Sequence, residues 1–127
     1  MNHHYIKSTE TVHVIGVNYI CEFLENAGFE ILERHTDPDH HFQLLAKTYR
    51  KNMLIAVRTG IYPDTGALDS TVKKQLIQES AQLEAVPHFT GLTLVPLETG
   101  DDGGGSPTEG KEYEIIFSGI SVVREPE

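Results

Sequence analysis

The sequence predicts a single α/β domain, in the α+β sense of a mixed central sheet flanked by helices, with the element order α-β-β-β-α-β-β. Two stretches place apolar residues at helical spacing, and five have the alternating or continuous apolar character of strands. A predicted helix between the third and fourth strands permits a parallel crossover. The chain of 127 residues has the length of one domain, so residues 1–127 are expected to fold as one unit.

The first helix is expected over residues 11–27. Its apolar stripe consists of Val17, Ile20, Leu24 and Ala27. Gly28 follows as the expected C-terminal cap, because a left-handed backbone is favoured there. Cys21, the one cysteine, lies on this helix and is expected to be a small buried hydrophobic residue.

Three strands are expected next, over residues 29–36, 41–48 and 53–59. Tyr49–Asn52 has the composition of a tight hairpin connection between the last two. The strand at 53–59 is apolar on both faces until Arg58, which predicts a central strand covered on both sides.

The second helix is expected to begin at a cap, Asp69 or Ser70, and to reach about Ala85, with Pro87 as its stop signal. Its apolar stripe consists of Val72, Leu76, Ile77 and Leu83. Two further strands are expected over residues 89–97 and 113–123. Residues 99–110 between them contain five glycines and no apolar residue, so they are expected to form a mobile surface loop.

Two local patterns point to a known family. A helix ends on a glycine and an aromatic residue at Gly28-Phe29, and a hairpin leads into the strand Leu54–Thr59. From about Val17 to Leu97 the order of elements resembles the restriction-endonuclease-like core of the PD-(D/E)XK nuclease superfamily. The resemblance implies two carboxylates that hold a divalent metal ion, and a lysine two residues after the second carboxylate.

The catalytic positions of that family fall on Gln43, Ala56 and Arg58. Glutamine is a poor ligand for a hard cation and alanine is none, so both acidic ligands are missing. The leading interpretation is a degenerate nuclease-like domain that has no cofactor and acts by binding. The alternatives are an active metal-dependent nuclease or hydrolase with displaced ligands, which would need a divalent metal ion, and a structural or assembly module.

A displaced metal site has one set of candidates. If the chain is extended, His35, Asp39 and His41 point to one side, and Glu22 on the first helix could join them. The other interpretation is turn chemistry around Asp37 and Asp39 together with solvated acids on a helix face.

The charge distribution adds a candidate anion-binding face. The net charge is −9, yet residues 43–78 carry six bases and two acids. The candidate anion-binding residues are Arg58, Lys47, Lys73, Lys74 and Gln75, with Arg50 and Lys51 expected beside them at the hairpin tip. A solvated basic surface is the competing interpretation. Any nucleic-acid binding is expected to be weak, about 10⁻⁴ to 10⁻⁶ M.

Partners and location are also predicted from the sequence. The strand at 113–123 is expected at a sheet edge, where strands pair with other chains, so a homodimer or a protein partner is expected. A single cysteine, the absence of a signal-peptide pattern and a longest apolar run of only Met53–Val57 predict a cytoplasmic protein without a membrane segment.

Overall fold

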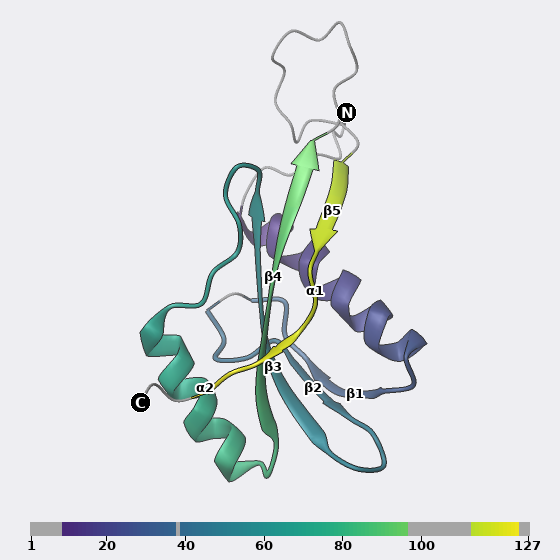
Figure 1. Ribbon diagram of the computed structural model, residues 1–127, viewed down its shortest axis with the longest axis vertical. Coiled ribbons are helices and arrows are strands. Elements are labelled where there is room, and N and C mark those ends of the chain that lie inside the picture. The colour runs from purple at the N-terminus through teal and green to yellow at the C-terminus, as the bar shows by residue number, and fades with distance from the viewer. Residues whose placement is uncertain (1–8, 38, 97–112, 125–127) are drawn as a thin grey trace, which may run out of the picture.

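The computed structural model describes residues 9–37, 39–96 and 113–124, and the side chains of residues 12–37, 39–96 and 113–124. A mixed sheet lies between two helices (Figure 1). The elements are α1 (Thr9–Asn26), β1 (Glu30–Arg34), β2 (Leu44–Lys47), β3 (Asn52–Ile61), α2 (Ser70–Gln82), β4 (Val86–Pro96), β5 (Tyr113–Phe117) and β6 (Ser121–Val122).

The sheet has the strand order β1-β2-β3-β4-β5, with β6 also paired to β4. β1, β2 and β3 form an antiparallel meander, and β3 pairs with β4 in parallel from Met53↔Val86 to Ile61↔Leu94. The fold class and the parallel crossover predicted from the sequence are therefore confirmed. From α1 to β4 the elements follow the order predicted from the sequence.

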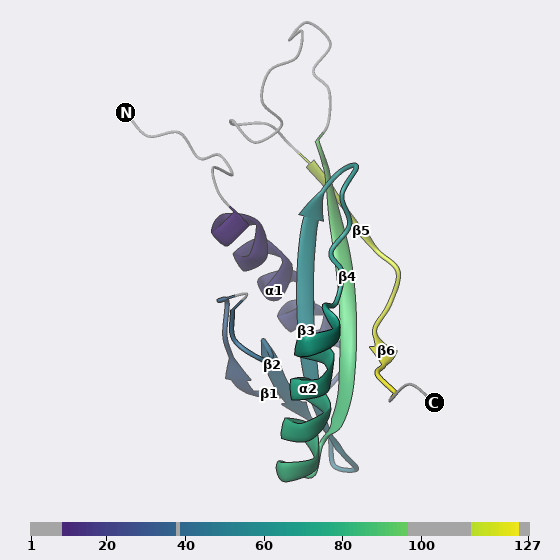
Figure 2. The same ribbon diagram turned by 90° about the vertical axis from the view of Figure 1, so that its left-hand side faces the viewer.

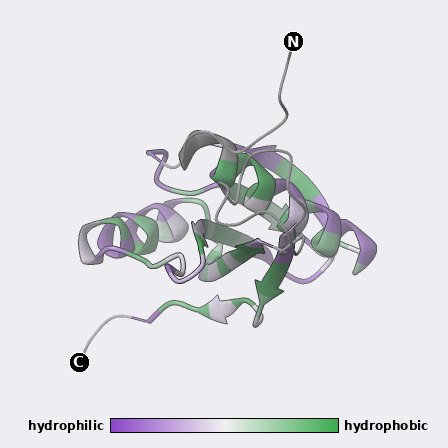
Figure 3. Cartoon of the chain, turned by 90° about the horizontal axis from the view of Figure 1, so that it is seen from above, coloured by the Kyte–Doolittle hydropathy of each residue, from purple (hydrophilic) through white to green (hydrophobic). Residues whose placement is uncertain are grey.

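The two helices cover opposite faces of the sheet (Figure 2). Alternate residues of β3 divide between the two cores, because strand side chains point to alternate faces. Ile55 and Val57 pack with α1, whereas Leu54 and Ala56 pack with Leu76 of α2. The strands between the helices are largely hydrophobic when seen from above (Figure 3), as expected for strands covered on both faces.

The first helix agrees with the sequence prediction except at its end. Val17, Ile20 and Leu24 are buried and Cys21 is 4% exposed, whereas Ala27 is exposed. Gly28 adopts φ +96°, and the amide of Phe29 donates to the carbonyl of Leu24 at 2.9 Å. Ala27 lies outside the stripe because the helix ends at Asn26, one residue before it.

The second helix begins as predicted and ends earlier than predicted. Asp69 caps it, and its side chain accepts a hydrogen bond from the amide of Thr71 at 3.0 Å. The helix stops at Gln82 because Glu84 adopts a left-handed backbone, φ +54°, and the amide of Ala85 returns to the carbonyl of Ser80. Pro87 is not the stop signal: it lies in β4, where its carbonyl accepts from the amide of Val123.

The single strand expected at 113–123 is wrong. The chain forms β5 and β6, which pair with different parts of β4. Gly119 separates them with φ +115°, and its carbonyl accepts from the hydroxyl of Thr90 at 3.0 Å. The loop expected at 99–110 lies outside the described residues. No helix among the described residues is long and apolar enough to cross a membrane.

Candidate functional site

The candidate site lies where the pairing of β2 with β3 ends. The last paired residues are Leu44 and Ile55. Beyond them a side chain takes over from the backbone: the Oε1 atom of Gln43 accepts from the amide of Val57 at 2.8 Å. Gln43 therefore extends the contact between the two strands by one step after the regular ladder has ended.

Gln43 is 0% exposed, and both ends of its amide are used. Its Nε2 donates to the carbonyls of Asp37 at 3.1 Å and His40 at 3.0 Å, so it also holds the loop between β1 and β2. Its Oε1 accepts from Val57 and from Nη1 of Arg58 at 2.7 Å. Only an amide supplies donors at one end and an acceptor at the other, so a carboxylate could not make the same contacts.

The structure brings Gln43 and Arg58 together, at hydrogen-bond distance. Nη1 of Arg58 also donates to the carbonyl of Val57 at 3.0 Å. Ala56, at the remaining one of the three positions, is fully buried in the apolar cluster beside α2, and its side chain contributes no polar atom. The three motif positions thus present an amide, a methyl group and a guanidinium.

Arg58 is partly buried, and its hydrogen bonds to described residues all go to neutral oxygens. Within the ranges that the structure describes, no carboxylate lies within 4.0 Å of its nitrogens. Burial lowers the pKa of Arg58, while the charges of Asp39 and Asp69 act in the opposite direction. A guanidinium remains protonated under such conditions, so the site carries a fixed positive charge.

His13 of α1 is a partly buried titratable group that was not among the predicted site residues. Its Nδ1 is buried and has no hydrogen-bond partner among the described residues. Burial lowers the pKa of His13, Arg58 lowers it further, and Asp39 raises it. The signal available in the sequence was its spacing, because His13 precedes Gly16 and Val17 by three and four residues and shares their helix face.

The approach of α1 to β3 is close at this corner. A Cβ atom on Gly16 would lie 1.8 Å from Oγ1 of Thr59, so only glycine fits this position without movement. Oγ1 of Thr59 is itself buried, and within the described ranges neither it nor Nδ1 of His13 has a hydrogen-bond partner.

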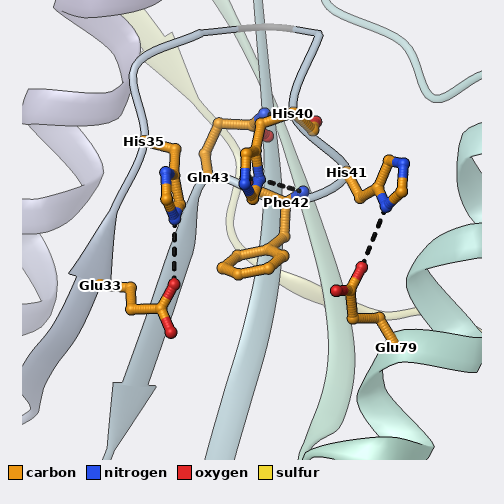
Figure 4. A network of polar contacts seen from close by, with 7 residues as sticks. All are labelled: Glu33, His35, His40, His41, Phe42, Gln43 and Glu79. Atoms are coloured by element: carbon orange, nitrogen blue, oxygen red, sulfur yellow. Dashed lines mark hydrogen bonds and ion pairs between the residues drawn. The ribbon is translucent and has the colours of Figure 1, made fainter.

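The proposed displaced metal ligands do not form one group. Glu22 is exposed on α1. Nε2 of His35 lies 3.0 Å from Glu33, and Nδ1 of His41 lies 3.0 Å from Glu79 of α2 (Figure 4). In the described part of the chain, no three His, Cys, Asp or Glu side chains are placed to hold a metal ion.

The segment that carries these histidines is not extended, contrary to the expectation behind that hypothesis. β1 ends at Arg34, and the loop then bends so that the rings of His35 and His40 stack with centroids 3.7 Å apart. Both rings lie nearly perpendicular to the ring of Phe42, while His41 points away toward α2 (Figure 4). The cluster is organised by ring packing and by the amide of Gln43.

The expected basic face divides into two places. Lys47, Arg50 and Lys51 lie at the β2–β3 turn, at the start of β3, whereas Arg58 is near its other end. Six residues of strand separate Asn52 from Arg58, about 20 Å. The prediction that these three bases flank the Arg58 site is therefore wrong, because β3 runs for 10 residues and the bases lie at its other end.

The candidates on α2 are closer to the site. The charge of Asp69, the cap of α2, acts on Arg58, so the first turns of α2 lie toward this corner. Lys74 is exposed, and Lys73 and Gln75 are partly buried. These three residues remain candidates for contact with a ligand held at Arg58.

The chain was also compared with known proteins. A solved structure titled as the Holliday junction resolvase Hjc of Archaeoglobus fulgidus, an archaeal hyperthermophile, is similar, with a TM-score of 0.49 and 17% identity. The match covers 64% of this chain and 66% of the resolvase chain. No curated protein matches the sequence significantly. A family model described as a domain of unknown function, DUF8840, matches residues 10–123, and the chain therefore belongs to this family.

Proposed function

We propose that this chain is a nuclease-like domain that acts by binding, without metal-dependent phosphodiester hydrolysis. The observation that carries the proposal is the state of Gln43. Its side-chain oxygen, which stands where the resemblance expects a carboxylate ligand, is occupied by the amide of Val57 and the guanidinium of Arg58.

The residues at the motif positions do not fit a divalent cation. Magnesium and manganese prefer several carboxylate or carbonyl oxygens, and the side chains at these positions offer one amide oxygen, which already accepts two hydrogen bonds. Arg58 places a fixed positive charge at hydrogen-bond distance from that oxygen, and this charge opposes a metal ion. The same charge favours an anionic group, so the site is suited to anion binding.

A cleavage assay tests the loss of catalysis. The untagged full-length protein is incubated with supercoiled plasmid in magnesium and in manganese, and we expect no nicking above buffer. Arg58→Met serves as the matched variant, because it removes the guanidinium and keeps much of the side-chain volume. The proposal would be contradicted if the wild type nicked the plasmid, a chelator abolished that nicking and Arg58→Met showed none.

The displaced-metal alternative is tested separately. It requires His35, Asp39, His41 and Glu22 to bind a metal ion, and a ligand that binds the folded state raises the melting temperature. We expect no stoichiometric metal in protein purified without an affinity tag, and no shift of the melting temperature with zinc, manganese or magnesium. Bound metal that is lost in His41→Gln would favour the alternative.

Self-association is a second candidate function, favoured by the state of the two sheet edges. β1 has charged residues at Glu30, Glu33 and Arg34 and an irregular register, features that protect an edge from pairing. Among the described strands β5 pairs with β4 alone, and its Ile116 is 53% exposed. We propose a homodimer formed through β5, and light scattering at micromolar concentration tests it: the mass of one chain would exclude it, and Ile116→Lys should lower the mass of a dimer.

A further inference from the structure

A cavity of about 280 Å³ lies between α1 and the edge strand β1. It is smaller than the pockets of about 300–1,000 Å³ that hold drug-sized ligands, so its size suits a small molecule. The residues that line it come from both elements and are Cys21, Glu25, Ile31, Leu32, Glu33 and Arg34. The motif positions 43, 56 and 58 are not part of this lining, so the cavity is separate from the site described above.

The strand β1 is irregular where it borders the cavity. Ile31 pairs with Ala46 and Glu33 pairs with Leu45, so the register shifts at Leu32, which lies between them. Such a bulge bends a strand and re-aims its side chains, and bulges occur preferentially beside functional sites. Leu32 is 43% exposed, so its apolar surface is available to a ligand in the cavity.

Opposite charges are placed at the two ends of the cavity by a row of residues on α1. Asn18, Cys21 and Glu25 follow one another at spacings of three and four residues, so they share one face of the helix. Nη1 of Arg34 donates to Oδ1 of Asn18 at 3.1 Å, which holds the guanidinium at one end of the row. Glu25 is at the other end, about 10 Å further along the helix. Cys21, which is 4% exposed, lies between them.

The charges of Arg34 and Glu25 are not neutralised by a direct ion pair within the described ranges, where neither residue has an oppositely charged side chain within 4.0 Å. Glu33, the other acid of the lining, differs because its carboxylate lies 3.0 Å from Nε2 of His35. Burial raises the pKa of Cys21, so its thiol is neutral near pH 7 and belongs to the apolar part of the wall. The cavity therefore has a positive end, an apolar middle and a negative end.

We propose that this cavity binds a small zwitterion whose carboxylate and ammonium groups are joined by a short apolar spacer. The carboxylate accepts hydrogen bonds from the Arg34 guanidinium, and the ammonium donates to the Glu25 carboxylate. The spacer lies against Cys21, Ile31 and Leu32. The two ends are about 10 Å apart along the helix and each hydrogen bond spans about 2.8 Å, which leaves room for a spacer of about three to five carbons.

Three matched ligands test whether both charged ends are used. The zwitterion ε-aminocaproate carries both groups, caproate lacks the ammonium and hexylamine lacks the carboxylate. NMR titration of the full-length protein should give a Kd of about 1 mM for ε-aminocaproate. Caproate and hexylamine should each bind about tenfold more weakly, because each loses a hydrogen bond to a charged group. Equal binding of the three ligands, or no binding of ε-aminocaproate at about 20 mM, would overturn the proposal.

The spacer and the location are tested with the same wild-type protein. Glycine has both charges and no spacer, so it should bind about tenfold more weakly than ε-aminocaproate. Addition of ε-aminocaproate should shift the backbone amide signals of Cys21, Glu25 and Leu32, and it should leave the signal of Lys51, at the β2–β3 turn, unchanged. Binding that shifts other signals and not those three lies outside the cavity and contradicts the proposal, as does glycine binding as tightly as ε-aminocaproate.

Two pairs of variants assign the two ends. Glu25→Gln and Arg34→Gln should each weaken the binding of ε-aminocaproate about tenfold. The matched controls, Glu22→Gln on the same helix and Arg50→Gln at the β2–β3 turn, change exposed residues outside the cavity and should bind as wild type does. Wild-type affinity in Glu25→Gln would overturn the assignment of the negative end. The inference does not rest on the proposed function, because plasmid nicking is measured independently of this ligand.

Discussion

β3 is held in two different ways along its length. From Asn52 to Ile55 it pairs with the backbone of β2 on one side, and from Met53 it pairs with β4 on the other. After Ile55 the pairing with β2 stops, and the side chain of Gln43 replaces it at Val57. The half of β3 that pairs with β2 contributes side chains to the cores on both faces of the sheet. The half near Gln43 carries the positive charge of Arg58 and the close contact of Thr59 with α1, and the Thr59 hydroxyl has no partner among the described residues.

The difference shows how a sheet makes room for a site. In a complete strand ladder each backbone amide already has a partner, so no N–H group is left to donate to a side chain. Where one strand leaves, a donor such as the amide of Val57 becomes available, and a buried polar side chain can satisfy it. That side chain then positions Arg58, which an apolar residue could not do.

The largest effect is expected from Gln43→Met. The change keeps the approximate volume but removes the partners of the Val57 amide, the Arg58 guanidinium and two loop carbonyls. We expect it to lower the free energy of unfolding by about 3 kcal/mol, because buried groups left unpaired cost roughly 1–3 kcal/mol each. Leu45→Met, in the regular half, should cost less than about 1.5 kcal/mol. Equal losses of unfolding free energy in the two variants, measured by urea denaturation, would show that Gln43 contributes only its volume.

The next effect concerns the close contact of α1 with β3. Gly16→Ala would place Cβ 1.8 Å from Oγ1 of Thr59, so we expect a loss of about 1–2 kcal/mol despite the better helix propensity of alanine. In a Thr59→Ala background the clash with the hydroxyl is absent, and the loss should be clearly smaller. A double-mutant cycle measures this coupling, and the same loss in both backgrounds would contradict the contact.

A smaller effect is expected at the start of α2. Asp69→Ala removes the side chain that accepts from the amide of Thr71, and loss of such a cap costs about 1 kcal/mol. Asp64→Ala provides the control, because Asp64 is an exposed acid in the same loop and caps no helix. Thermal unfolding of the two variants should differ, and identical midpoints would mean that the cap is not used.

The smallest effect is the pH dependence of stability that comes from His88. This residue lies on β4 opposite Ile55, beside the regularly paired half of β3. Burial lowers its pKa in the folded state, so the unfolded chain takes up the proton first as the pH falls. The free energy of unfolding should therefore decrease below about pH 7 and level off once the folded state is also protonated. Urea denaturation across this range should give a shallower slope for His88→Gln, whereas an unchanged slope would assign the dependence to other groups.

Local signals predicted most of the fold. The stripe of Val17, Ile20 and Leu24, the cap at Gly28 and the continuous apolar strand before Arg58 each reflect contacts between near neighbours in the chain. The errors arise where a residue has two uses. Pro87 can stop a helix or enter a strand beside a partner that needs only its carbonyl, and Gly119 can belong to a strand or divide it.

The sequence by itself determined the order of elements from the first helix to the fourth strand, because that order depends on periodicity and residue type. Only the tertiary structure decided what Gln43 does, since its bonds to Val57 and Arg58 join residues 14 and 15 positions apart and depend on where β2 leaves β3. It likewise decided that Lys47 lies far from Arg58. That distance is set by the length of β3 and by its pairing with β2, and neither is a property of any short segment.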